Sequence, residues 1–84
     1  MKQKGLRLAD PADYEIRVLG ALDLTWSDRL QGLSIRVIEY ADRVLVTSLS
    51  GKLKDQAALL GVLNALFSLK LPLLFVCSLE QIEN

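Results

Sequence analysis

Hydrophobic and polar side chains alternate along two stretches of the chain, Tyr14–Ala21 and Leu33–Tyr40. In the first stretch Tyr14, Ile16 and Val18 share one face of an extended strand, because successive side chains of a strand point to opposite faces. The second stretch follows the same rule with Leu33, Ile35 and Val37. Both stretches are therefore predicted to be strands with one buried face.

The second half of the chain predicts two more strands around one long helix. Arg43–Leu49 is rich in Val, Leu and Thr and is predicted to be a strand that Ser50-Gly51 ends, with Ala41-Asp42 as the hairpin turn before it. Strong helix formers fill 55–69, and Asp55 lies in the first turn, where a carboxylate is favoured. Pro72 cannot continue that helix and opens a last strand that is apolar on both faces until Ser78.

The only tryptophan of the chain lies in an insert between the first two strands. Asp23 and Thr25 are rival helix caps, and Gly32 suits the position after a helix, so 26–31 is predicted to be a short helix. At helical spacing Trp26 and Leu30 share one face. Trp26 then covers one end of the core; alternatively it is partly exposed and forms a contact surface with Arg29.

The order of elements predicts an α+β domain of the ferredoxin-like βαββαβ type with a short first helix. We expect a four-stranded antiparallel sheet in the order 4-1-3-2 with both helices on one face. The single domain is expected to span 14–80, after a flexible N-terminal tail at 1–13 and before a polar tail at 81–84. The alternative is a βββαβ sheet in which the insert is only a loop.

Two sets of apolar residues exceed what such a fold can bury. On a helical wheel the apolar side chains of 58–69 fill an arc of roughly 200°, whereas packing on one sheet face needs only about 100–140°. Leu60 and Phe67 lie at the margin of this arc. Leu19, Ile38 and Tyr40 share the sheet face that should be polar. Surplus apolar surface favours association, so a homo-oligomer, most simply a dimer, is expected to use one of these two surfaces.

Composition excludes several classes of function. Ten basic and ten acidic residues cancel, which argues against nucleic-acid binding. The longest apolar run, 71–77, is far shorter than the roughly 20 residues that span a bilayer, so we expect no membrane partner. Cys77 is the only thiol, which favours a reducing, cytoplasmic location. The chain has no histidine, which removes the commonest general base and metal ligand. No catalytic, cofactor or metal site is predicted, because no nucleophile, base or ligand set is recognisable.

Two segments, YEIRVLGALDLTWSDRLQGLSI at 14–35 and DQAALLGVLNALFSLKLPLLFV at 55–76, are similar to a family of small uncharacterised bacterial α/β proteins. The shared positions are Gly20, Leu22-Asp23, Trp26-Ser27, Gly32-Leu33, Asp55-Gln56 and Pro72. The chain departs from the family pattern at Leu30, where an aromatic is more frequent, and at Lys54, where a Pro or small residue is. The resemblance implies a bacterial soluble α/β protein and no assigned activity.

The first functional hypothesis is a non-enzymatic interaction module that self-associates and docks on a larger protein. Its candidate contact residues are Trp26, Arg29, Leu60, Phe67, Leu19, Ile38 and Tyr40. A second hypothesis is an ACT-like regulatory domain with a small ligand against the loop at 20–25. A third is a dimeric α+β-barrel enzyme whose polar groups would be Arg17, Arg36 and Glu15.

Overall fold

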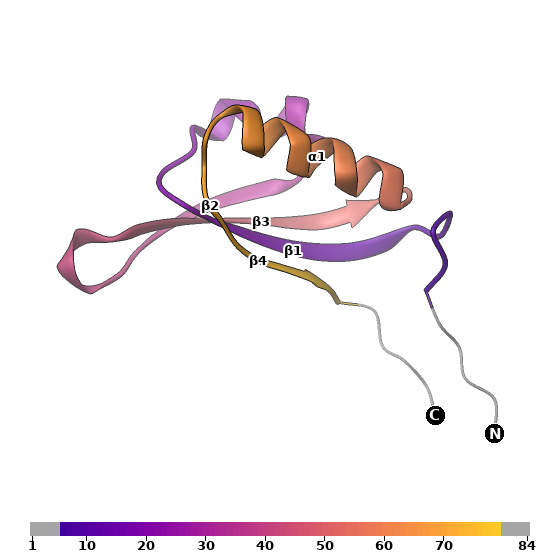
Figure 1. Cartoon of the computed structure of the whole chain (residues 1–84), viewed down its shortest axis with the longest axis horizontal. Coiled ribbons are helices and arrows are strands. Elements are labelled where there is room, and N and C mark those ends of the chain that lie inside the picture. Colours follow the sequence, from indigo (N-terminus) through magenta and orange to yellow (C-terminus); the bar gives the residue numbers. More distant parts are fainter. Residues whose placement is uncertain (1–5, 80–84) are drawn as a thin grey trace, which may run out of the picture.

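Four strands form one antiparallel sheet in the order β2-β3-β1-β4, which reads 4-1-3-2 from the other edge (Figure 1). The computed structural model describes residues 6–79. Its strands are β1 (Ala12–Leu19), β2 (Ser34–Glu39), β3 (Leu45–Leu53) and β4 (Leu73–Ser78). The helical segments are the 3-10 helices η1 (Leu24–Leu30) and η2 (Ala41–Arg43) and the α-helix α1 (Gln56–Ser68). The predicted α+β class and the four-stranded antiparallel sheet are confirmed.

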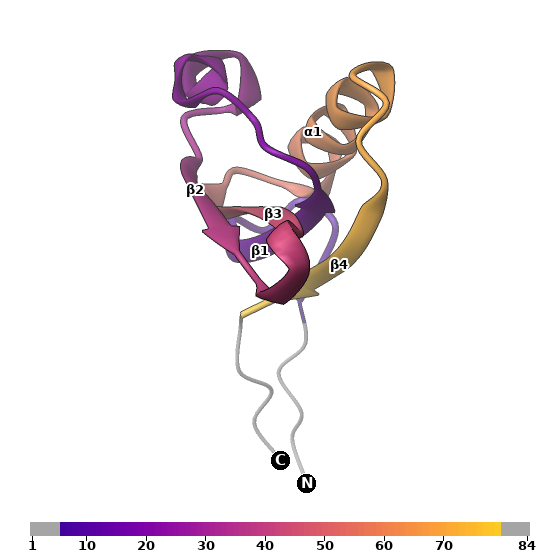
Figure 2. The same ribbon diagram turned by 90° about the vertical axis from the view of Figure 1, so that its left-hand side faces the viewer.

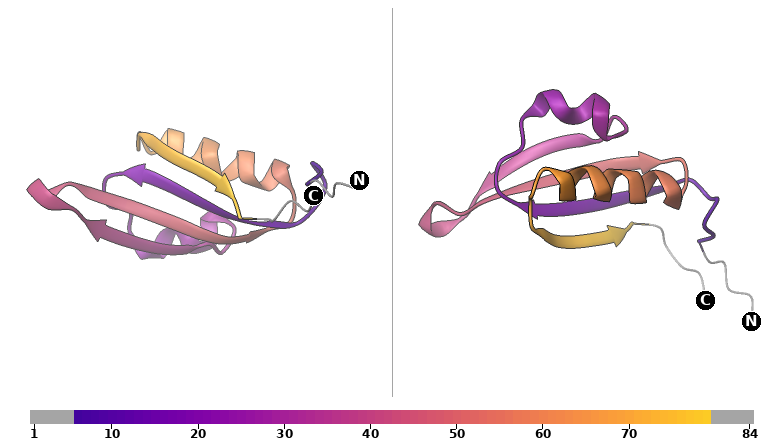
Figure 3. Two further views of the ribbon diagram at one scale, coloured as in Figure 1. Left: turned by 90° about the horizontal axis from the view of Figure 1, so that it is seen from below. Right: turned by 45° about the horizontal axis from the view of Figure 1, so that its top comes forward.

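The long helix and η1 both lie on one face of the sheet, and the other face is open (Figures 2 and 3). Helix α1 lies on the side of β1 and β4, whereas η1 lies on the side of β2 (Figure 2). The sheet therefore has a protected inner face below the helices and an open outer face.

The core fills the space between the inner sheet face and the helices. From β1 it takes Tyr14, Ile16 and Val18, each at most 2 % exposed. Other members are Ala12, Leu22, Leu30, Leu33, Leu49, Leu53, Ala58, Val62 and Leu66. The alternation of β1 thus places the predicted residues inside, and each fully buried aliphatic side chain contributes about 1.5–3 kcal/mol to folding.

The first strand begins earlier than predicted. Ala12 is fully buried and pairs with Leu53, so the expected tail at 1–13 extends too far. Leu6 packs against the core, and the carbonyl oxygen of Leu8 accepts a hydrogen bond from the N–H of Gln56 at 2.9 Å. The rest of the two predicted tails, residues 1–5 and 81–84, lies outside the described residues.

The third strand is longer than the prediction, because it continues through Ser50-Gly51 to Leu53. Gly51 is part of the ladder, opposite Tyr14. Its φ of +149° and the 3.0 Å between a Cβ built at this position and Leu33 Cδ2 both favour glycine. The glycine that resembles a turn signal therefore makes room for a core leucine.

The insert folds into the 3-10 helix η1, so its type differs from the predicted α-helical turns. Asp23 is the cap, and its Oδ1 accepts the N–H of Thr25 at 2.9 Å. Gln31 and Gly32 both have positive φ and end the segment. The capping role expected of Thr25 is not observed, because Asp23 takes it.

Helix α1 follows the prediction closely. Asp55 is its N-cap, and Oδ1 accepts the N–H of Ala58 at 2.8 Å. The chain turns at Lys70, which has a φ of 61°, and Pro72 then leads into β4. The helix therefore runs from the end of β3 back to the start of β4 (Figure 1).

Candidate interaction surface

The two flanks of helix α1 differ in character. Ala58, Val62 and Leu66 form its buried line. At 100° per residue, Leu63 and Phe67 lie on one flank of this line and Gly61 on the other. The flank with Leu63 and Phe67 is the apolar one, and Phe67 is 83 % exposed there.

The apolar flank of α1 faces the free edge of the sheet at β4. A right-handed helix that lies above the sheet and runs antiparallel to β4 turns the residue after each buried position toward that edge. Figures 1 and 2 show this direction of α1 and the edge position of β4. Leu63 and Phe67 therefore lie on the β4 side of the helix. Leu60 is turned about 160° from the buried line, near the top of the helix, and is 58 % exposed.

An apolar groove begins on this flank, at the first turns of α1. It has a volume of about 620 Å³. Its lining residues are Leu8, Ala9, Asp55, Gln56, Ala57, Leu59, Leu60 and Leu63. Leu8 and Ala9, in the turn before β1, thus extend the apolar surface of α1 beyond the helix itself.

Strand β4 exposes hydrophobic side chains on both of its faces. Leu73 and Leu74 are 53 % and 52 % exposed, and Val76 is 36 % exposed. Val76 pairs with Ile16 and lies on the inner, helix-covered face of the sheet. The helix layer therefore does not cover the sheet at this edge. We call Leu60, Leu63, Phe67, Leu73, Leu74 and Val76 the α1–β4 surface.

Leu19 and Ile38 both lie on the open face of the sheet, as predicted. Val46 of β3 pairs with Leu19 on one side and with Ile38 on the other, so the three form one apolar row. Val46 is 6 % exposed and Leu19 is 40 % exposed. Tyr40 follows β2 and is half exposed, and its N–H donates to the carbonyl of Val44 to close the hairpin.

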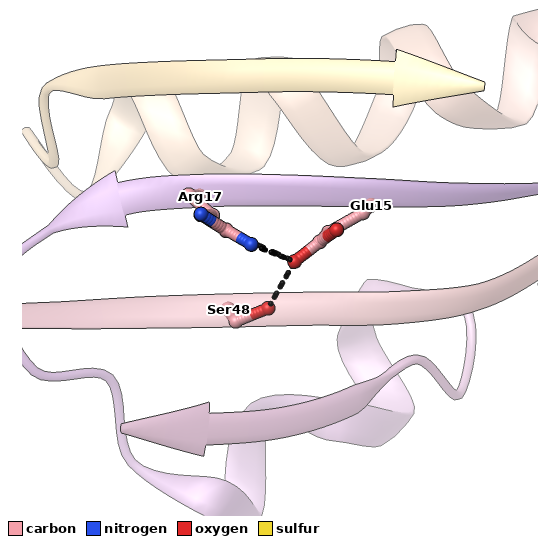
Figure 4. A network of polar contacts seen from close by, with 3 residues as sticks. All are labelled: Glu15, Arg17 and Ser48. Atoms are coloured by element: carbon pink, nitrogen blue, oxygen red, sulfur yellow. Dashed lines mark hydrogen bonds and ion pairs between the residues drawn. The ribbon is translucent and has the colours of Figure 1, made fainter. Parts of the chain in front are cut away.

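A polar network occupies the centre of the open face (Figure 4). Nε and Nη2 of Arg17 each lie 2.9 Å from Glu15 Oε2, and Ser48 Oγ donates to the same oxygen at 3.1 Å. The hydrogen bond from Arg17 is the main cause that lowers the pKa of Glu15 below its ordinary value. The guanidinium of Arg17 also lies over the ring of Phe75, 5.1 Å from its centroid. The pair is thus held in place from β3 and β4.

A hollow of about 340 Å³ lies beside this network. It is lined by Glu15, Ser34, Arg36, Ser48, Ser50 and Leu79. Within residues 6–79 the Arg36 side chain makes no hydrogen bond or ion pair, although its charge helps to lower the pKa of Glu15. The hollow therefore contains the Arg36 guanidinium beside the Glu15 carboxylate, which Arg17 already binds.

Trp26 and Arg29 form a separate pair on η1. The guanidinium of Arg29 lies 5.1 Å from the Trp26 ring, which is partly buried and packs against the core. The ring thus packs against the core, as the first interpretation predicts, and it also contacts Arg29. The role of Trp26 in a contact surface stays a prediction. Helix η1, which carries this pair, lies on the β2 side of the fold (Figure 2).

The sequence-based candidates thus fall on three surfaces: η1, the open face and the α1–β4 surface. Leu73, Leu74 and Val76 were missed as contact residues. Their signal was the run of apolar residues on both faces of the last strand, which also fits a fully buried central strand. Only the position of β4 at the sheet edge distinguishes the two cases.

The part of the chain that the structure describes contains neither a cluster of metal ligands nor a membrane-spanning helix. No three His, Cys, Asp or Glu side chains of residues 6–79 gather as metal ligands would. In the same range no helix is long and apolar enough to cross a membrane. Cys77 is a free thiol of intermediate exposure.

Comparison with known proteins identifies one family. The family model described as a domain of unknown function (DUF8691) matches residues 13–77, which includes β2, β3, α1 and all but the first residue of β1 and the last residue of β4. No curated protein and no solved structure matches the chain. The match therefore identifies a family without transferring an activity or a ligand.

Proposed function

Because the chain belongs to the DUF8691 family, whose function is unknown, we propose from its surface that it is a non-enzymatic interaction module that self-associates through the α1–β4 surface. The observation that carries this proposal is the exposure of Val76. Ile16 and Val76 are paired and share the inner sheet face, yet Ile16 is fully buried and Val76 is 36 % exposed. A second copy that covers this edge completes the core.

The size of the α1–β4 surface fits this role. Side chains of this size present on the order of 150–200 Å² when fully exposed, so its exposed members offer on the order of 500 Å². A stable interface buries about 800 Å² on each partner. The backbone of the edge strand and the groove at Leu8 and Ala9 can supply the remainder. Single exposed leucines elsewhere, such as Leu24, need no such explanation.

The proposal is tested by Phe67→Asp in sedimentation equilibrium. Phe67 is 83 % exposed, so the substitution leaves the monomer folded but places a carboxylate inside the proposed interface. An interface anchor contributes about 2 kcal/mol or more, which is roughly a thirtyfold weaker dimer. Leu24→Asp is the matched control, because Leu24 is 63 % exposed on η1. Equal dimer dissociation constants for both variants would contradict the proposed surface.

The finer fold assignment is part of the proposal. We assign the chain to the ferredoxin-like arrangement, supported by the 4-1-3-2 order, by the antiparallel pairing of all neighbours and by the helical segments on one face. We also keep the prediction of a bacterial protein, which the family resemblance implies, and of a cytoplasmic location, for which the single thiol argues. Docking on a larger protein remains a further proposal, with the Trp26–Arg29 pair on η1 as the surface left free by the dimer.

Small-ligand binding is the second candidate, and the hollow beside Arg36 favours it. The loop at 20–25, where an ACT-like ligand was expected, is closed by Thr47, whose Oγ1 donates to Gly20 O and accepts from Leu22 N–H. Of the polar groups expected for a barrel enzyme, Glu15 and Arg17 pair with each other. The unpaired guanidinium of Arg36 instead points to a small carboxylate or phosphate as ligand.

Amide chemical shifts test this second candidate. Titrations with sodium acetate, glycine and inorganic phosphate should each report on Ser34, Arg36 and Ser50, and the strongest responder identifies the anion class. Arg36→Ala should abolish the shifts, and Arg43→Ala, at an exposed arginine beside the hairpin, should leave them unchanged. The candidate is wrong if no probe shifts these amides, or if Arg36→Ala responds like the natural protein.

A further inference from the structure

The β1–β4 ladder fixes the direction in which each peptide group of β4 points. The N–H of Leu79 donates to the carbonyl oxygen of Asp13 at 2.8 Å. In an antiparallel pair, hydrogen-bonded and non-hydrogen-bonded residue pairs alternate. Counting back along the register, Cys77 and Phe75 bond to β1, and Val76 directs its N–H and C=O away from β1. Since β4 is an edge strand, these groups of Val76 lie on the free edge of the sheet.

The two edges of the sheet differ in their protection against pairing. The β2 edge carries Arg36 and Glu39, and charged side chains discourage an edge strand from pairing with another chain. The β4 edge has no charged side chain from Leu73 to Leu79 and no proline after Pro72. A neutral, apolar edge strand of this kind is a template for a further strand.

We infer that two copies of the chain pair their β4 strands antiparallel, edge to edge, to form one continuous eight-stranded sheet. This inference rests on the proposed self-association and names its geometry. A two-fold axis perpendicular to the sheet keeps both α1 helices on the same face. The apolar flanks of the two helices, with Leu63 and Phe67, then face each other above the paired strands and cover Val76.

A second copy fits this edge because the edge is complementary to itself. An antiparallel two-fold pair lets the outward N–H and C=O groups of one strand meet those of the other. No charge on β4 repels its copy, and the flank of α1 supplies an apolar partner for its own image. Together these features use the free backbone groups and the exposed side chains in one contact.

The direction of the peptide groups also limits the register. Residues whose N–H and C=O groups point outward, such as Val76, must pair with one another in hydrogen-bonded positions. Phe75 and Cys77 alternate with these residues, so Phe75 and Cys77 of one copy meet Phe75 or Cys77 of the other in non-hydrogen-bonded pairs. The Cα atoms of such a pair lie about 4.5 Å apart, which is within the range that a disulfide can bridge. Both side chains lie on the open sheet face, because they pair with Arg17 and Glu15.

Oxidative cross-linking tests this geometry. We expect disulfide dimers to form rapidly in one of three proteins, and the reactive one identifies the register. Native Cys77 reports a Cys77–Cys77 pair, Phe75→Cys a pair between positions 75 and 77, and Phe75→Cys/Cys77→Ser a pair between two positions 75. Arg29→Cys/Cys77→Ser is the matched control, with an exposed cysteine on η1, and should cross-link only slowly. Hydrogen exchange on the unmodified protein is the second measurement. The amide of Val76 should become protected as the protein concentration rises, whereas that of Ile16, bonded to β3, stays protected throughout.

The outcomes separate this inference from the proposed function. If light scattering shows a dimer but no β4 cysteine cross-links faster than the control and the Val76 amide stays unprotected, strand pairing is wrong and self-association stands. If the protein is a monomer throughout, both fail. If Val76 becomes protected only with a different protein bound, the edge takes a foreign strand and the second copy is excluded as its occupant.

Discussion

Ile16 and Val76 lie opposite each other on the inner face of the sheet, and only Ile16 is covered by the helices. The first is fully buried and the second is 36 % exposed. The core is therefore closed over β1 and open over the neighbouring strand β4. A domain of this size buries only about 60–65 % of its unfolded surface, so closing this edge with a second copy adds apolar burial that the single chain lacks.

Tyr14→Phe should stabilise the fold. Tyr14 is 2 % exposed, and its hydroxyl has no hydrogen-bond partner within residues 6–79. An unsatisfied buried hydroxyl costs about 1–3 kcal/mol, so its removal should raise the free energy of unfolding by about 1 kcal/mol. Urea unfolding measures this change, with Tyr40→Phe as the half-exposed control. A loss of stability in Tyr14→Phe would show that the hydroxyl is bound.

Asp55→Ala should destabilise α1. The carboxylate caps the helix by accepting the N–H of Ala58 at 2.8 Å, and loss of such a cap typically costs about 1 kcal/mol. Asp28→Ala is the control, because Asp28 is an exposed carboxylate in the middle of η1. Thermal unfolding of both variants should separate them. Equal midpoints would mean that the cap contributes nothing.

Thr47→Val should loosen the loop between β1 and η1. Thr47 is fully buried, and its hydroxyl bridges the carbonyl of Gly20 at 2.7 Å and the N–H of Leu22 at 3.0 Å. The valine leaves both backbone groups without this partner, which costs about 1–3 kcal/mol. Thr47→Ser keeps the hydroxyl and loses one methyl group, so it should retain the loop amide protection that Thr47→Val loses. The reverse order would contradict the role of the hydroxyl.

Glu15 should make stability depend on pH. Its folded pKa lies below the ordinary value of 4.5, chiefly because of the hydrogen bond from Arg17. A carboxyl group with a lowered folded pKa stabilises the fold above its unfolded pKa, and this contribution is lost as the pH falls through the folded pKa. Glu15→Gln should therefore lose least stability, relative to the natural protein, at the acidic end of a series from about pH 6 to about pH 3.

The control for this series is Glu39→Gln on β2. Within the described residues Glu39 forms no ion pair, so this variant should follow the pH dependence of the natural protein. Parallel curves for Glu15→Gln and the natural protein would show that the Arg17 pair contributes nothing to stability.

Alternation along β1 was enough to predict its buried face, because burial on a sheet repeats every second residue. The helix was equally readable, since Asp55 and Pro72 mark its limits. The end of β3 was not, because Gly51 resembles a turn signal until Leu33 is found against it. Such a contact joins residues far apart in the sequence, and local pattern cannot predict it.

The candidate surface was predicted in part. The margin position of Leu60 and Phe67 on the helical wheel predicted a surplus on α1, and both are exposed. The inclusion of β4 could not be predicted, because a strand that is apolar on both faces has the same pattern at the centre and at the edge of a sheet. Only the strand order assigns Val76 to an open edge.

The most direct test of the central claim is light scattering behind a sizing column, over a wide range of protein concentration. Self-association through the α1–β4 surface predicts a molar mass that rises to twice the 9.3 kDa of one chain and that Phe67→Asp holds near the single-chain value. A natural protein that stays at the mass of one chain at every concentration would contradict the claim that a second copy completes this core.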